Sequence, residues 1–138
     1  MPHGIYHRLL PAVALASAAQ TTGVANGASV DLGKFGNDFE SALFVIQAGT
    51  ITDGTHVATL QDSPDGTTWT DVDAAHTQGG PVSLGSAQSN TVAALGYLGG
   101  GPARYVRLVL TTTGATTGGV IGAVAVMAEG SNDPVHRS

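Results

Sequence analysis

Four carboxylates lie close to the only tryptophan of the chain. Asp62, Asp65, Asp71 and Asp73 flank Trp69 on both sides. Carboxylate oxygens are the ligands that Ca²⁺ prefers, so this stretch is a candidate calcium site. The spacing does not match the D-x-D-x-D-G pattern of a calcium-binding loop, however. We therefore expect these side chains to serve turns and strand edges, and we predict no metal site.

A pair of acidic side chains could also hydrolyse a glycosidic bond, because most glycosidases use two carboxyl groups. A sugar cleft usually offers several aromatic platforms as well, and this chain has one Trp and three Tyr. No serine stands in a G-x-S-x-G elbow, and the glycine run at 99–101 lacks the lysine of a phosphate loop. The sequence thus predicts no catalytic residues, no cofactor and no enzyme activity.

Histidine is the commonest side chain for binding transition metals, and the chain has five of them. They are His3, His7, His56, His76 and His136. Their spacing is too wide for a local motif such as H-E-x-x-H. Folding could still gather two or three of them, but we expect surface or terminal positions.

Two arginines stand three residues apart in a stretch with strand-like alternation. Side chains alternate along a strand, so Arg104 and Arg107 should point to opposite faces. We expect one of them to be buried or at an interface, where a guanidinium needs a partner carboxylate. This makes the pair a candidate for a subunit contact.

The composition narrows the class of partner. The formal net charge is −5, and only five Lys and Arg residues are spread along the chain. Nucleic acid is excluded as the main partner, because phosphate binding needs clustered basic side chains. Charged residues make up 11% of the chain, against about 25% in an ordinary soluble domain. We infer that part of the surface is buried against another molecule.

The chain has no cysteine, which excludes disulfides and thiolate metal sites.

Short apolar or alternating runs separated by glycine-centred turns predict strands. The expected strands are residues 28–32, 41–48, 56–61, 67–72, 82–84, 91–98, 104–111 and 120–128. The run 41–48 is almost continuously apolar, which is typical of a strand covered on both faces. Asp53 and Gly54 predict a two-residue hairpin turn, and Trp69 is the expected anchor of the core. The pattern predicts an all-β fold, a single antiparallel β-sandwich or jelly roll of seven to eight strands.

The N-terminal part imitates a signal peptide, with His7 and Arg8 before an apolar run that reaches residue 18. That run is too short to span a bilayer, which takes about 20 apolar residues, and we predict no membrane partner. We expect residues 1–27 to form an extended N-terminal arm or first strand that lies on another surface. Residues 28–128 should form the β-sandwich, and 129–138 a polar C-terminal tail.

Several segments resemble small structural proteins encoded in tailed-phage and prophage genomes. The strongest is S-P-D-G-T-T-W-T-D-V at 63–72, and the similarity runs in order from about residue 28 to 128. The segments are 42–46, 49–56, 60–72, 96–99, 104–108, 112–114 and 117–120. The resemblance implies a virion component, most simply a capsid decoration (cement) protein. Such a protein binds the outer surface of the shell after assembly in the host cytoplasm. Its partners would be the major capsid protein and neighbouring copies of itself, as a trimer in the type that it resembles.

A weaker resemblance leads to a second function. The segments 65–70 and 104–107 are similar to discoidin-type galactose-binding jelly rolls, where such residues build turns and core. This resemblance implies a carbohydrate-binding module. A tail or head-fibre component that adheres to the host surface is a further alternative. An exposed aromatic platform would favour glycan binding, whereas many copies per particle would favour the virion function.

Overall fold

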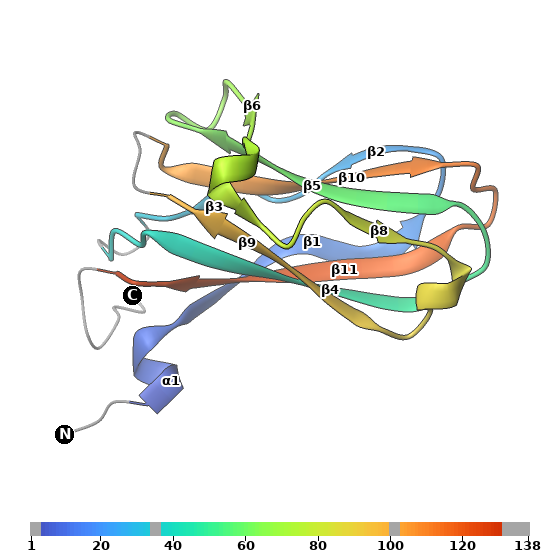
Figure 1. The fold of residues 1–138 in the computed structure, drawn as a ribbon, viewed down its shortest axis with the longest axis horizontal. Coiled ribbons are helices and arrows are strands. Elements are labelled where there is room, and N and C mark those ends of the chain that lie inside the picture. Colours follow the sequence, from blue (N-terminus) through green and yellow to red (C-terminus); the bar gives the residue numbers. More distant parts are fainter. Residues whose placement is uncertain (1–3, 34–36, 100–102, 131–138) are drawn as a thin grey trace.

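The computed structural model describes residues 4–33, 37–99 and 103–130 of the chain. Two antiparallel β-sheets pack face to face and enclose one hydrophobic core (Figure 1). The predicted all-β antiparallel sandwich is therefore confirmed. Several of its strands are only two to four residues long, and this is why the sequence pattern indicated fewer strands than the structure contains.

The first sheet, here called sheet A, has the strand order β1-β11-β4-β9-β7. These strands are β1 (Leu10–Gln20), β4 (Ser41–Ile51), β7 (Thr77–Gln78), β9 (Val92–Leu98) and β11 (Gly119–Ala128). None of them contains a charged residue or a histidine. The long strands β1, β4 and β11 account for most of the sheet.

The second sheet, sheet B, has the strand order β2-β10-β5-β6, with β3 beside β10 and β8 beside β5. Its strands are β2 (Gly23–Asn26), β3 (Val30–Asp31), β5 (Thr55–Ser63), β6 (Thr70–Asp71), β8 (Val82–Leu84) and β10 (Tyr105–Thr113). The long β5 and β10 pair along their whole length, from Thr55 opposite Thr113 to Ser63 opposite Tyr105. Sheet B carries all the charged strand residues of the sandwich.

The core lies between the two sheets, because alternate side chains of each strand point inward. Sheet A contributes Phe44, Ile46 and Ile121, and sheet B contributes Leu108 and Leu110, all fully buried. Aliphatic side chains fill most of this space. Trp69 is not among them, so its predicted place as the core anchor is wrong. It lies in the loop that precedes β6, outside the sandwich.

Residues 10–26 belong to the sandwich. Strand β1 is the edge strand of sheet A and pairs with β11 from Leu10 to Gln20, and β2 pairs with β10 in sheet B. The β1 register shifts twice, between Val13 and Leu15 and between Leu15 and Ala18. Such bulges bend an edge strand and discourage further pairing. Only the short helix α1 (Gly4–Arg8) stands away from the sheets (Figure 1).

The turn at Asp53 and Gly54 differs from the predicted hairpin. It joins β4 to β5, and these two strands lie in different sheets. Gly54 has a φ of +89°, which suits glycine. The Asp53 carboxylate accepts hydrogen bonds from the backbone N–H groups of Thr116 and Gly118, at 3.1 and 2.6 Å. These bonds fasten the β4–β5 connection to the turn that joins β10 to β11. Two 3₁₀ turns, η2 (Ala74–His76) and η3 (Ser86–Gln88), complete the fold.

Candidate functional site

The four carboxylates around Trp69 have separate structural partners. Asp65 Oδ1 accepts the N–H groups of Thr67 and Thr68, at 2.9 and 3.0 Å, as in an acidic turn cap. These backbone donors, with that of Thr68 first, hold the pKa of Asp65 well below its usual range. Asp73 caps η2 and lies 2.7 Å from His76 Nδ1, and that side chain lowers the pKa of Asp73.

The other two carboxylates bind side chains of neighbouring strands. Asp71 Oδ1 accepts a hydrogen bond from Gln61 Nε2 at 2.9 Å. Asp62 Oδ2 accepts the hydroxyl of Tyr97 at 2.9 Å, which joins sheet B to sheet A. Burial of the Tyr97 ring, together with the negative charge of Asp62, raises the pKa of this phenol.

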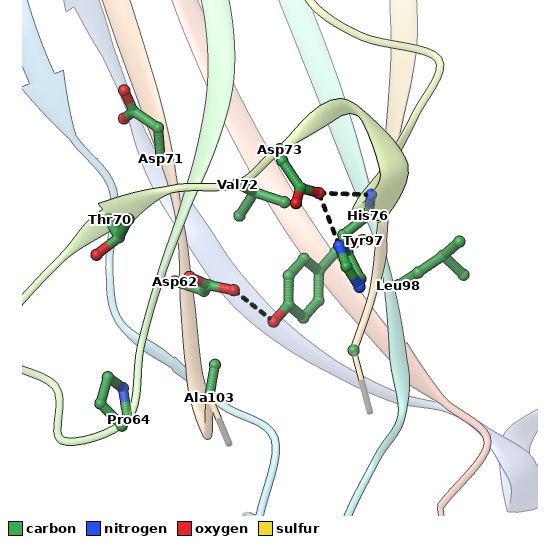
Figure 2. A pocket seen from close by; sticks show the side chains of 11 residues that line it. Asp62, Pro64, Thr70, Asp71, Val72, Asp73, His76, Tyr97, Leu98 and Ala103 are labelled. Atoms are coloured by element: carbon green, nitrogen blue, oxygen red, sulfur yellow. Dashed lines mark hydrogen bonds and ion pairs between the residues drawn. The ribbon is translucent and has the colours of Figure 1, made fainter. Parts of the chain in front are cut away.

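Three of these carboxylates, Asp62, Asp71 and Asp73, line an open hollow of about 340 Å³ together with Tyr97 and His76 (Figure 2). Asp62 and Asp73 approach it from opposite sides, and each points to its own partner, Tyr97 and His76. Across residues 4–33, 37–99 and 103–130, no group of three or more acidic or histidine side chains is placed to hold a metal ion. The arrangement is a set of turn caps and strand links.

The histidines do not gather either. His7 and His76 lie on the surface, as expected, whereas His3 and His136 fall outside the described residues. His56 contradicts the expectation, because it is fully buried between the sheets. Its Nδ1 atom lies 2.8 Å from Thr112 Oγ1, and its Nε2 atom lies 3.2 Å from the carbonyl oxygen of Asp53. A carbonyl can only accept, so Nε2 carries the proton and Nδ1 accepts the Thr112 hydroxyl. His56 is a structural bridge.

Arg107 and Trp69 form a contact on the outer face of sheet B. The guanidinium carbon lies 4.4 Å from the ring centroid. Arg107 Nε and Nη2 both donate to Gln61 Oε1, at 3.0 and 2.7 Å. The expectation of a carboxylate for the less exposed arginine was therefore wrong, since a side-chain amide and an indole ring take that place. Arg104 is the exposed member, and its Nε and Nη2 bind the two carboxylate oxygens of Asp31 at 2.7 and 2.9 Å.

The outer side of sheet A is apolar, in contrast to the polar outer side of sheet B. Among the described residues, most of the large apolar side chains that are exposed lie on this side. We call this surface the apolar face; its exposed members are Val13, Leu43, Val92, Leu98, Val120 and Val124. The strand register places Val13, Val124 and Val45 side by side across three neighbouring strands. Exposed apolar side chains that adjoin one another in this way are a feature of interaction surfaces.

Polar groups on the apolar face are few. Gln47 and Ser17 lie towards one end, and Ser41 lies at the other, where its hydroxyl donates to Glu129 Oε1 at 2.8 Å. A hollow of about 340 Å³ lies at the first of these ends, and both Gln47 and Ser17 line it. Its wall includes Gly122, which has no side chain, and a Cβ atom at this position would overlap Ser17. The face therefore has both protruding side chains and a depression.

Helix α1 is the second exposed apolar feature. Ile5 and Tyr6 are 74% and 67% exposed, and no residue of the helix is buried. The helix begins just before the edge strand β1 and extends past the end of the sandwich (Figure 1). A short segment with exposed apolar side chains gains stability when it lies against another surface.

The comparisons with known proteins give no family. A scan against models of known protein families finds no match, and a search of curated proteins finds no similar sequence. None of the helices in the described part of the chain has the length and apolar character that crossing a membrane requires.

Sequence reasoning concentrated on polar residues and missed the apolar face. A signal was available, because the segments that form β1, β4, β9 and β11 contain no charged residue. These segments also do not alternate polar with apolar residues. An antiparallel sheet with one solvated face normally alternates apolar with polar residues.

Proposed function

We propose that this protein is a non-enzymatic virion structural protein, a decoration protein that binds the outer surface of a tailed-phage capsid. The phage-like segments at 42–72 and 96–120 support the virion part of the proposal. The polar clusters that could have carried chemistry are occupied by turn caps and strand links. In this proposal the protein acts by binding other molecules through its exposed surfaces.

The observation that carries the proposal is the exposed apolar helix α1. A cement protein attaches to a preformed shell through extended termini and edge strands, and α1 lies directly before an edge strand. Ile5 and Tyr6 together offer a small apolar anchor of the kind that forms the centre of an interface. Binding to the assembled shell, and not to free subunits, would stabilise the shell by mass action.

The test is binding to empty shells of the phage that encodes the chain. The informative variant replaces Ile5 and Tyr6 with serine, because β1 from Leu10 onward belongs to the sandwich and must be kept. We expect the double variant to bind at least about 10-fold more weakly, the effect of losing two buried apolar side chains. Val24→Ser, at a 64% exposed valine of β2, is the matched control. Equal binding of the double variant and the control would overturn the role of α1.

A second candidate function is glycan binding, and the position of Trp69 favours it. The ring lies outside the core on the polar outer side of sheet B, next to Arg107 and above the strand that carries Gln61. Aromatic rings beside hydrogen-bonding side chains are typical of sugar sites. Titration of the intrinsic fluorescence with simple sugars tests this, since Trp69 is the only tryptophan. A saturable change would support glycan binding, and no change would exclude it for those sugars.

A further inference from the structure

Strands β4 and β11 are apolar on both sides. In β4, Phe44 and Ile46 point into the core, whereas the outward Leu43 is 45% exposed. In β11 the outward Val124 is 44% exposed. Strands with this composition are typical of sheets that are covered on both faces. Only the inner face is covered in the single chain, so the outer face is suited to a second layer.

The apolar face has a raised part and a recessed part on the two sides of one row of residues. The register places Val45 opposite Val124, with Leu43 and Val126 two residues to one side. Gln47 and Gly122 lie two residues to the other side, where the hollow is. The row that contains Val124 therefore borders the hollow, which extends to one side of it, and the ridge lies on the other side. A two-fold axis along this row would place the ridge of each copy over the hollow of the other.

The distribution of charge also favours a copy of the same chain. The chain has a formal net charge of −5, so two copies repel each other when acidic surfaces meet. The strands of sheet A contain no charged residue, and the acidic side chains Asp31, Asp62 and Asp71 belong to sheet B. Contact through the apolar face keeps the acidic side chains of the two B sheets on opposite sides of the pair.

We propose that the apolar face of sheet A binds the apolar face of a second copy, with the two-fold axis close to Val124 and Val45. This contact is isologous, so each copy gives and receives the same surface. The strands of the two copies then run in opposite directions. The two α1 helices consequently extend from opposite ends of the pair. The proposal does not depend on the virion function, but it would give a decoration protein two attachment points.

The size of the face sets the expected affinity. Four strands at about 4.8 Å spacing and seven residues at about 3.3 Å rise give a projected area of roughly 400 Å². Two such surfaces with protruding side chains bury on the order of 1,000 Å², near the lower limit of specific interfaces. We therefore expect a reversible dimer with a dissociation constant of about micromolar size.

The test is sedimentation equilibrium of the full chain from about 1 to 200 μM, a range that spans the expected constant. Val124→Asp and Val124→Lys are measured alone and as an equimolar mixture. Like charges at the axis should make each variant monomeric, with a mass of 13.7 kDa. The mixture should recover dimers of twice that mass, because Asp and Lys then face each other. Val24→Asp, at a valine of sheet B that is 64% exposed, is the control and should dimerise as the wild type does.

Three results would overturn the proposal. The first is a wild-type chain that stays monomeric over the whole range. The second is a Val124→Asp variant that dimerises as well as Val24→Asp does. The third is a mixture that remains monomeric, which places residue 124 away from the axis. Circular dichroism of each variant separates these results from loss of folding. If the wild type is monomeric and the Val124→Asp variant no longer binds empty shells, the apolar face binds the capsid instead of a second copy.

Discussion

The guanidinium carbon of Arg107 lies 4.4 Å from the centroid of the Trp69 ring. This contact places the tryptophan on the outer side of sheet B, where it orders the loop before β6. The hydrogen bonds from Arg107 to Gln61, and from Gln61 to Asp71, continue the network across β10, β5 and β6. The largest aromatic side chain of the protein therefore stabilises a surface loop and is not among the core residues.

Removal of the arginine should expose the indole. In Arg107→Ala, we expect the fluorescence emission of Trp69 to shift to longer wavelength because water replaces the guanidinium. The stability loss should be about 1 kcal/mol, the size of a partly desolvated cation–π contact. Arg104→Ala is the control, because Arg104 is exposed and its guanidinium binds Asp31. An emission maximum unchanged from wild type would mean that Arg107 does not cover the ring.

The buried pair of His56 and Thr112 should behave as one unit. His56→Leu leaves the Thr112 hydroxyl buried without its partner, and we expect a loss of about 2 kcal/mol in the free energy of unfolding. Thr112→Val should add little in the His56→Leu background, because both polar groups are then gone. Urea unfolding of the two single variants and the double variant measures this. Strictly additive losses would show that the two side chains are not coupled.

The crossover turn should contribute to stability in a pH-dependent way. The backbone N–H of Gly118, followed by that of Thr116, lowers the pKa of Asp53 in the folded protein. Below the unfolded pKa of about 3.9, the unfolded chain then binds more protons than the folded chain does. The contribution of Asp53 is therefore complete above that pH and is lost as the pH falls through the folded pKa.

Thermal unfolding of wild type and Asp53→Asn between pH 7 and pH 2 measures this effect. We expect the variant to be less stable at pH 7 and to lose less stability than wild type on acidification below pH 4. Asp71→Asn is a control, because Asp71 binds only a neutral amide on the surface. Parallel curves for wild type and Asp53→Asn would contradict the prediction.

The hydrogen bond between Tyr97 and Asp62 should link the two sheets weakly. Tyr97→Phe keeps the buried ring and removes the hydroxyl, so we expect a loss of about 1 kcal/mol. Chemical denaturation checks this value. A variant as stable as wild type would indicate that water satisfies Asp62 equally well.

Much of the fold could be predicted from the sequence, because its signals are local. Alternation in 104–111 and the apolar run 41–48 both mark strands that the structure contains. Sheet membership could not be predicted. Asp53 and Gly54 have the composition of a hairpin turn, yet Asp53 binds the 116–118 turn and the chain crosses to the other sheet. Long-range pairing decides such cases, and it leaves no local pattern.

The candidate surface was harder to predict than the fold. The run 41–48 indicated a strand covered on both faces, but the sequence alone did not reveal that the outer face is left exposed in the single chain. Trp69 was expected in the core because it is large, whereas the adjacent polar residues and Arg107 hold it at the surface. Burial of His56 depends on Thr112, which lies far away in the sequence.

Quantitative mass spectrometry of purified particles, from the phage or prophage that encodes this chain, tests the central claim most directly. If the protein decorates the shell, it should be present in a fixed ratio to the major capsid protein and in many copies per particle. Washing at moderate salt should not remove it, since the proposed anchor is apolar. Particles that contain the major capsid protein but none of this chain would contradict the account.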